Sequence, residues 1–409
     1  MATKTWAGGA TGNWNVASNW SPSGVPATGD DVVINTSGCD VTLDVHIGGG
    51  QTNTGLNSLT ITSGLLDTND GSNRMLTVDE AVDIGTAGDL DLNGSDVSFG
   101  TLNVANGASA SIIFSSATTT ITLEPNSTHP TWGFGIGSAA TANFNSGTIK
   151  FAKVTSGTRY LQMGGQGVHV LNDVIIDTNY DIPWASHFEA ASLDIQDGNL
   201  NSYGGSDSIT ITGDLTVGNG TDAASLTYTA DSNGFHDQKF GSVTINPNGT
   251  LEASNQTTTI TGETSGGFAW KNTGTYTHNN GKVIIDYDTG NFSHDTAVQE
   301  NVWYDFEIKL NSASNFVLFK DNSGNVVTFL GDLTITKGKF DDHSNGDEYI
   351  IHGNTVIESD GAFGVATSWH TGNITHHGLV VLNGGTYYRS DAGGTVKMGG
   401  IRNIGGSIL

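Results

Sequence analysis

The sequence predicts an all-β fold, an elongated parallel β-helix or β-solenoid with coils of roughly 20–28 residues and a Trp-rich N-terminal cap. Short runs of Val, Ile, Leu, Thr and Phe at period two occur throughout, bounded by Gly, Asn, Asp and Ser. The 57 glycines in 409 residues are about twice the usual share, and no long window shows apolar residues at helical spacing. A short motif also recurs along the chain. Together these observations indicate strands and tight turns in repeated units.

The recurring motif is a large apolar residue, any residue, a β-branched apolar residue, and then a glycine. Its copies begin at Leu59, Val82, Leu102, Leu193, Leu215, Val243, Leu333 and Thr355. The steps from 59 to 82, 82 to 102, 193 to 215 and 333 to 355 are nearly equal, as expected of one short coil. The two apolar residues face one side of a strand, and the glycine allows a turn with positive φ. Such a unit cannot bury its inner face alone, so we expect the copies to stack.

The sequence also contains a longer duplication, which includes several copies of the short repeat. Thr141–Phe151 resembles Thr275–Ile285 at an offset of 134, whereas a later pair of segments (209 and 327) is offset by 118. The difference predicts an insertion of about a dozen residues around Tyr180–Ala190. The predicted segments are a Trp/Gly-rich cap or attachment segment (1–50), the first solenoid coils (51–131), a first superunit (132–268), a second superunit (269–368) and a partial third superunit (369–409).

Aromatic residues are the candidates for surface or partner contact. We expect longer loops to project from one edge of the solenoid at Ile182–Ala190, Asn233–Gln238, Phe292–Val302 and Asp341–Asp347. The contact candidates are Trp6, Trp14, Trp20, Trp184, His187 and Trp303. An indole can stack on a sugar ring, but it can equally anchor a loop. In the N-terminal segment the indoles can also cover the open end of the first coil or attach to a partner protein.

Composition restricts the partners. The 41 acidic and 15 basic side chains give a net charge of −26, which opposes binding to nucleic acids or anionic membranes. No run of 18 apolar residues predicts membrane insertion, and the opening residues lack the pattern of a Sec signal peptide. We therefore expect the protein to leave its cell as part of an assembled particle. The single cysteine, Cys39, excludes an intrachain disulfide and is expected to be an inert thiol.

No residue pattern predicts an enzyme. Carboxylates on one strand face could act as an acid–base pair in glycoside hydrolysis. The candidate pairs are Asp89 with Asp91, Asp194 with Asp214, and Asp341 with Asp342. Because acidic residues are so frequent in this chain, such pairs are expected by chance.

No metal or cofactor is predicted, with Ca²⁺ as the one ion whose ligands occur together. Oxygen-rich turns at Asp67–Asn73 and Asp321–Asn325 could hold Ca²⁺, or their side chains could cap their own turns. The consecutive His376 and His377 would point to opposite faces of a strand, so the histidines form no ligand motif.

The opening segment Thr5–Asn35 reads TWAGGATGNWNVASNWSPSGVPATGDDVVIN. With the TGDLTI-like and HNNGKVI-like segments that follow, it resembles the Gly/Thr/Asn-rich β-solenoid repeat proteins of marine tailed-phage virions and of bacterial surface adhesins. The resemblance covers nearly the whole chain and implies a β-solenoid with a structural or host-contact role. It implies virion or surface proteins as partners, host glycans as further candidates, and self-association as an option. It supplies no catalytic residues for this sequence.

These observations predict a non-enzymatic structural or host-contact protein located in a tailed-phage virion, as a fibre, spike or decoration component. The alternative is a bacterial adhesin or surface-layer protein located at the cell surface. A second alternative is a polysaccharide depolymerase of the tailspike type.

Overall fold

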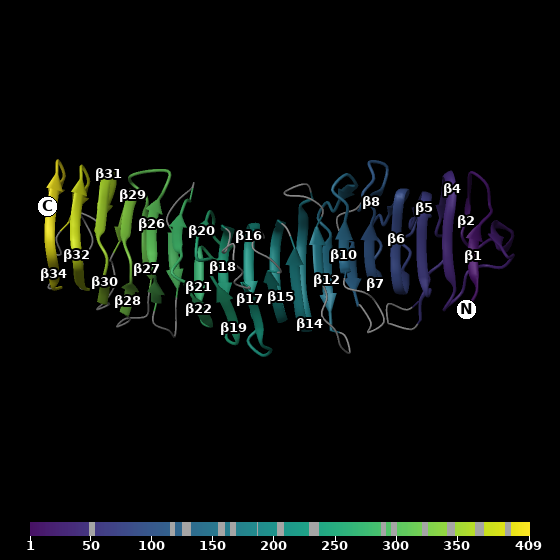
Figure 1. Ribbon diagram of the computed structural model, residues 1–409, viewed down its shortest axis with the longest axis horizontal. Coiled ribbons are helices and arrows are strands. Elements are labelled where there is room, and N and C mark those ends of the chain that lie inside the picture. The colour runs from purple at the N-terminus through teal and green to yellow at the C-terminus, as the bar shows by residue number, and fades with distance from the viewer. Residues whose placement is uncertain are drawn as a thin grey trace. The chain divides into compact units, whose positions relative to one another are not determined.

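The computed structural model describes residues 1–48, 54–114, 119–124, 132–153, 160–163, 169–185, 187–202, 208–228, 237–287, 292–295, 301–320, 326–341, 348–364, 372–388 and 394–409. It divides into two compact units, Met1–Asp207 and Ser208–Leu409. Each unit is a parallel β-solenoid in which the strands of successive coils stack in sequence order (Figure 1). The described residues include one 3₁₀ turn, Ala17–Asn19. None of the described residues forms a helix long and apolar enough to cross a membrane.

The strands of the first unit are β1 (Thr3–Trp6), β2 (Thr11–Asn13), β3 (Trp20–Ser21), β4 (Asp31–Thr42), β5 (Ser58–Asp67), β6 (Leu76–Asp91), β7 (Val97–Val104), β8 (Ser111–Ile113), β9 (Thr120–Leu123), β10 (Trp132–Ile136), β11 (Thr141–Asn143), β12 (Thr148–Ala152), β13 (Tyr160–Met163), β14 (Leu171–Ala185) and β15 (Phe188–Ser202).

The strands of the second unit are β16 (Ile209–Val217), β17 (Ala224–Thr227), β18 (Gln238–Ile245), β19 (Gly249–Glu252), β20 (Thr257–Ile260), β21 (Trp270–Asn272), β22 (Thr275–Thr277), β23 (Lys282–Ile285), β24 (Phe292–Asp295), β25 (Asn301–Trp303), β26 (Asp305–Lys309), β27 (Phe316–Lys320), β28 (Val326–Phe329), β29 (Leu333–Asp341), β30 (Glu348–Ile351), β31 (Thr355–Phe363), β32 (Asn373–Asn383), β33 (Thr386–Tyr387), β34 (Val396–Ile404) and β35 (Ser407–Ile408).

The pairing of strands confirms the stacking of the predicted repeats. Leu59 pairs with Val82, and Val82 pairs with Leu102, so three motif copies lie side by side in the first unit. In the second unit Leu333 pairs with Thr355. The predicted motif starts are therefore equivalent positions on neighbouring coils.

The coils are less uniform than the repeat spacing suggests. Val174 pairs with Leu193 on the next coil, whereas Leu102 pairs with Phe134. The first of these coils is shorter than the predicted range of coil lengths, and the second is longer. Turns between strands can lengthen without disturbing the stacked strands, so coil length varies while register is kept.

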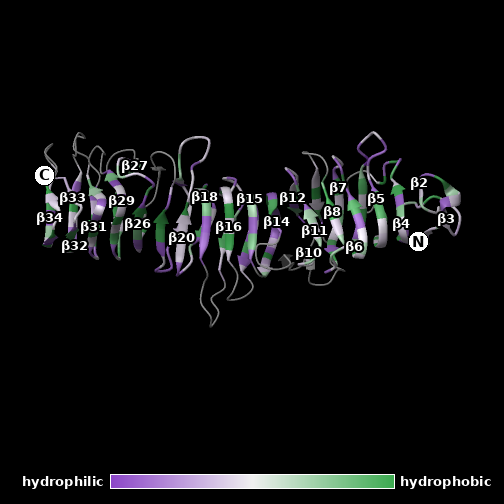
Figure 2. Cartoon of the chain, turned by 90° about the horizontal axis from the view of Figure 1, so that it is seen from above, coloured by the Kyte–Doolittle hydropathy of each residue, from purple (hydrophilic) through white to green (hydrophobic). Residues whose placement is uncertain are grey.

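Alternating burial produces the core. Leu59, Ile61 and Leu66 of β5 are fully buried, whereas Thr62, between them in the sequence, is exposed. Figure 2 shows the same mixture of hydrophobic and hydrophilic residues along the strands of both units. Each buried Leu or Ile contributes about 1.5–3 kcal/mol relative to exposure, so the stacked inner faces supply the main stabilisation.

The motif glycines are needed for two different reasons. Gly64 and Gly338 have φ of +91° and +98°, which confirms the predicted left-handed turn. Gly88 and Gly249 do not have positive φ. There, a Cβ would lie 2.0 Å from the carbonyl oxygen of Ile61 and 2.2 Å from that of Val217 respectively. These two glycines therefore permit close approach of neighbouring coils.

The Trp-rich segment forms the first coil of the first unit. Strands β1 and β2 pair in parallel with β4, through Thr3 with Asp31 and Thr11 with Asp40. Strand β4 in turn pairs with β5. Solenoid pairing therefore begins inside the predicted segment 1–50, before residue 51.

The predicted loop at Ile182–Ala190 is wrong over the residues that the structure describes. Ile182–Ala185 is the end of β14, and Phe188 begins β15. The register between β14 and β15 shifts just before this segment, from Asp177 opposite Asp197 to Asp181 opposite Asn199, so β14 holds two extra residues there. The proline and polar residues of this stretch resemble a loop, but buried Ile182 and Trp184 supply an inward-facing pair.

The other predicted loops fall largely on residues that the structure does not describe, namely 229–236, 296–300 and 342–347. The boundary between the two compact units lies after Asp207, within the predicted segment 132–268.

Candidate functional site

The three N-terminal tryptophans form one buried cluster. Trp6, Trp14 and Trp20 are 3%, 0% and 2% exposed. Trp20 makes edge contacts with both others, at ring-centroid distances of 5.2 Å to Trp6 and 4.7 Å to Trp14. Its indole N–H donates to the carbonyl oxygen of Trp14 at 2.8 Å. This placement favours a packing role for these side chains over surface contact.

The glycines of the opening segment accommodate this cluster. A Cβ at Gly8 would lie 2.5 Å from the Cζ2 of Trp6, and a Cβ at Gly12 would lie 2.8 Å from the Nδ2 of Asn19. The pattern of Trp, Gly-rich turn and NW in the sequence is therefore a packing motif of the first coil.

The remaining contact candidates are also largely buried. Trp184 in β14 and Trp303 in β25 are 1% and 2% exposed. Trp303 packs edge-on against Trp270, with ring centroids 4.9 Å apart. The half-buried His187 places its Nε2 3.5 Å from the Oε2 of Glu189. The indoles of Trp184 and Trp303 thus line the interior of the coils, and the structure does not bring the six candidates together at one surface.

The single thiol is enclosed. Cys39 is 2% exposed, and burial raises its pKa above the ordinary thiol value. A Cβ at Gly64 on the next coil would lie 2.5 Å from its sulfur. Both observations agree with the predicted inert thiol.

Outer-face aspartates bond to serines of the next coil. In four cases an aspartate accepts a hydrogen bond from the serine directly opposite it on the following coil: Asp31 from Ser58 at 2.8 Å, Asp89 from Ser111, Asp173 from Ser192 at 2.6 Å, and Asp214 from Ser242 at 2.5 Å. Hydrogen bonds to charged groups contribute about 1.5–3 kcal/mol each. These carboxylates therefore connect adjacent coils.

Carboxylates of the candidate acid–base pairs also accept hydrogen bonds. Asp89 accepts a hydrogen bond from the hydroxyl of Ser111, and Asp91 accepts one from the backbone N–H of Asn93 at 2.9 Å. Asp194 accepts from the side chain of Gln196 at 2.6 Å, in the first unit, whereas Asp214 belongs to the second. Asp341 is buried, and Asp342 lies outside the described residues.

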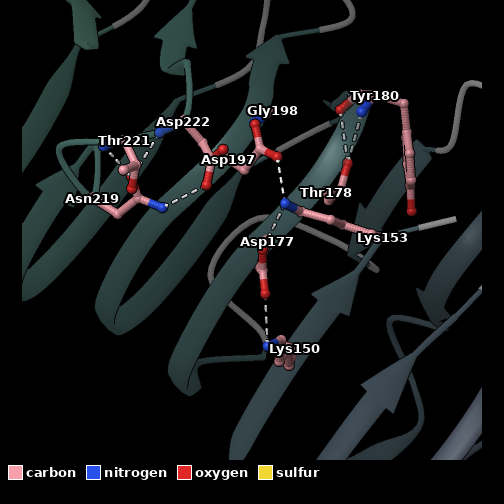
Figure 3. Close-up of polar contacts among 10 residues, drawn as sticks. All are labelled: Lys150, Lys153, Asp177, Thr178, Tyr180, Asp197, Gly198, Asn219, Thr221 and Asp222. Carbon is pink, nitrogen blue, oxygen red and sulfur yellow. Dashed lines mark hydrogen bonds and ion pairs between the residues drawn. The ribbon is translucent and has the colours of Figure 1, made fainter.

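A ladder of lysines and aspartates crosses the coils of β12, β14 and β15 (Figure 3). Asp177 and Asp197 lie directly opposite each other, an arrangement that is unfavourable for like charges. The Nζ of Lys153 lies 3.0 Å from Asp197 and 4.0 Å from Asp177, and Lys150 lies 2.8 Å from Asp177. Two of the few basic residues thus offset repulsion between neighbouring coils.

Asx turns use the oxygens that were candidates for Ca²⁺. In Asp67–Asn73, the side chain of Asp67 accepts from the N–H of Asn69 at 2.8 Å, and Asn69 accepts from Gly71 at 2.7 Å. The hydrogen bond from Arg74 lowers the pKa of Asp70, and burial raises the pKa of Asp67. Asp321–Asn325 lies outside the described residues.

The second unit has a similar turn. Asn219 accepts from the N–H groups of Thr221 and Asp222 at 2.8 and 2.9 Å (Figure 3). Within the described ranges, no three His, Cys, Asp or Glu side chains converge as a metal site would require.

A polar corner of the second unit escaped the sequence analysis. Asp305 accepts from the N–H of Asp332 at 2.7 Å, Asp332 from that of Asn354 at 2.7 Å, and Asn354 from that of Leu379 at 3.1 Å. Each of these side-chain oxygens thus binds a backbone N–H of the next coil. The corresponding signal in the sequence is a glycine before an acceptor residue, at Gly331 and again one coil later at Gly353.

Beside this corner lie two exposed histidines, His352 and His377, whose pairing was not predicted. The rings of His352 and His377 are stacked, with centroids 4.8 Å apart and planes 6° from parallel. Their signal in the sequence is a His-Gly dipeptide that begins at His352 and recurs at His377, one coil later.

Comparison with known protein families gives a match to the N-terminal part of the chain. Residues 5–129 match a family model described as a domain of unknown function (DUF8693), which spans the Trp-rich segment and most of the predicted first solenoid coils. No curated protein and no solved structure matches the chain.

Proposed function

We propose that this chain is a non-enzymatic structural or host-contact protein of a tailed-phage virion, serving as a fibre, spike or decoration component. The observation that carries the structural role is the use of its polar side chains. Aspartates that face outward accept hydrogen bonds from the serines opposite them on the next coil, as Asp173 does from Ser192. Side chains so engaged hold a scaffold together.

The aromatic residues support the same role. The five tryptophans that were candidates for contact are at most 3% exposed, so their area stabilises the coils. A glycan-binding surface of stacked rings would need exposed ring faces. Contact with a host or with other virion proteins would then use the outer strand faces and turns, which carry the excess negative charge.

The virion setting rests on the resemblance of Thr5–Asn35 and the following repeats to phage and adhesin solenoid proteins. A bacterial adhesin or surface-layer protein at the cell surface is the alternative that shares this resemblance. The two settings require the same scaffold and differ in where the protein is found.

The deciding experiment measures location and copy number. Particles released from a culture that carries the gene are purified by density gradient, and the chain is quantified by mass spectrometry against the major capsid protein. A fixed copy number per particle supports the proposal. Absence from particles together with antibody labelling of intact cells would establish the adhesin alternative.

A separate assay tests for catalysis. The purified chain is incubated with capsular and lipopolysaccharide glycans of the host, and the products are examined for new reducing ends and unsaturated sugars. We expect none above a buffer control. Sustained release of oligosaccharides would replace the structural proposal with a depolymerase.

A further inference from the structure

The histidine pair of the second unit has a fixed backbone. His352 directly follows β30 and His377 lies in β32. The N–H of His352 donates to the carbonyl oxygen of Phe329 at 2.8 Å. A Cβ on Gly378, the residue after His377, would lie only 2.2 Å from the carbonyl oxygen of Gly353. The two coils are therefore in close contact where the histidines project, and the spacing of the rings follows from the stacking of the coils.

The ring nitrogens of this pair are available. Seven histidines have side chains that the structure describes, and in five of them a ring nitrogen already has a partner: His46 with the N–H of Met75, His169 with Gly137, His187 with Glu189, His278 with the N–H of Asn280, and His376 with Thr355 and Tyr387. Among the described residues, the rings of His352 and His377 stack on each other and make no hydrogen bond. Both side chains are exposed.

The geometry favours a metal ion over a sugar. A sugar would stack on a ring face, but each ring already covers one face of the other. The ring edges remain open, and these carry the nitrogens. Two nitrogens at about 2.0–2.1 Å from one ion are roughly 3.3 Å apart in tetrahedral coordination and roughly 2.9 Å apart at adjacent positions of the tetragonal coordination that Cu²⁺ prefers. Because an imidazole lone pair lies in the plane of its ring, the two nearly parallel rings, with centroids 4.8 Å apart, must tilt out of their stacked arrangement for one nitrogen of each to converge on the same ion. Both side chains are exposed, so each can change rotamer to do so. The net charge of −26 also concentrates cations near the protein.

We propose that His352 and His377 form a two-histidine site for a first-row divalent cation that prefers imidazole, with Cu²⁺ bound more tightly than Ni²⁺ or Zn²⁺. Two protein ligands leave the other coordination positions to water or to a ligand from another molecule. The hard, oxygen-preferring ions Mg²⁺ and Ca²⁺ do not bind there.

The test titrates the full chain with Cu²⁺ alone, using calorimetry for affinity and electron paramagnetic resonance for the number of bound nitrogens. The variants are His352→Asn, His377→Asn and the double variant. The matched control is His278→Asn, since His278 is also stacked on a ring of the next coil, Tyr304, but has one nitrogen engaged. Circular dichroism confirms that each variant is folded.

We expect wild type to have a site with two coordinated nitrogens. Each single variant should weaken that site by at least about tenfold, the loss that even a second-shell partner of a metal ligand produces. The double variant should lose the site, and the control should retain it. The proposal is overturned if wild type lacks such a site, if either single variant binds Cu²⁺ as wild type does, or if His278→Asn causes an equal loss.

Discussion

The buried histidine of β32 should make the second unit sensitive to mild acid. His376 is 1% exposed, its Nδ1 lies 2.7 Å from the hydroxyl of Thr355, and its Nε2 lies 3.1 Å from that of Tyr387. Burial lowers its pKa from the ordinary 6.5 to about 4. Replacing His376 with Gln retains hydrogen-bonding groups at this position and removes the titration.

The direction in which stability changes with pH follows from proton binding. Between pH 6.5 and 4 the unfolded state binds a proton at His376 that the folded state does not, so acid favours unfolding. The stabilisation is complete above pH 6.5 and decreases as the pH falls towards 4. At about 1.4 kcal/mol per pKa unit, the full difference is about 3.4 kcal/mol, of which roughly 2 kcal/mol is lost between pH 7 and pH 5.

The measurement has to be local, because each coil of a solenoid contacts only its neighbours and can open by itself. Hydrogen exchange monitored by mass spectrometry on peptides from β31, β32 and β33 gives the free energy of opening at pH 7 and pH 5, after correction for intrinsic exchange. We expect this free energy to fall by about 2 kcal/mol more in wild type than in His376→Gln.

Subtracting the variant from wild type cancels the carboxylates, which titrate in both proteins. An equal pH dependence in the two proteins would refute the reasoning, since it would mean that His376 is not the group responsible. A constant offset between them at both pH values would reflect only the altered hydrogen bonds.

Three further substitutions test the packing of the coils. Trp14→Ala should destabilise the first unit by about 3–5 kcal/mol, because it leaves a large cavity in the Trp cluster; urea denaturation followed by tryptophan fluorescence measures it, and a change below about 1 kcal/mol would contradict the buried placement. Ser242→Ala removes the donor to Asp214 and should lower the free energy of opening of β16 and β18, measured by hydrogen exchange, by about 1.5–3 kcal/mol. No change in that free energy would show that this hydrogen bond between the coils is not stabilising. Gly353→Ala should strongly reduce the yield of folded protein, because its Cβ would lie 2.3 Å from a carbonyl oxygen of the preceding coil. The control Gly262→Ala should fold, since the atom nearest to its Cβ would be 3.4 Å away, and equal yields of the two variants would argue against the close approach.

Much of the fold could be predicted from the sequence because its determinants are local. Period-two alternation selects strands, and the apolar pair with its glycine marks equivalent positions on successive coils. The predicted starts at Leu59, Val82 and Leu102 pair with one another as expected. The segment Ile182–Ala185 was missed as a strand because Pro and polar residues interrupt its alternation.

The roles of individual side chains could not be predicted in this way. Whether Trp14 covers the core or faces solvent depends on how the first coil packs, and a tryptophan suits either place. Likewise, the acidic composition does not reveal that Asp173 bonds to Ser192, since that pairing depends on register between coils.

The sequence by itself determined that this chain forms stacked parallel strands, because alternation and turn residues act within a few positions. Only the tertiary structure decided which polar groups meet, because the length of chain between paired positions differs from coil to coil, as the short step from Val174 to Leu193 and the long step from Leu102 to Phe134 show. With such variable turns, no fixed period connects a residue to its neighbour on the next coil. The pairing of His352 with His377 is therefore visible only once the coils are stacked.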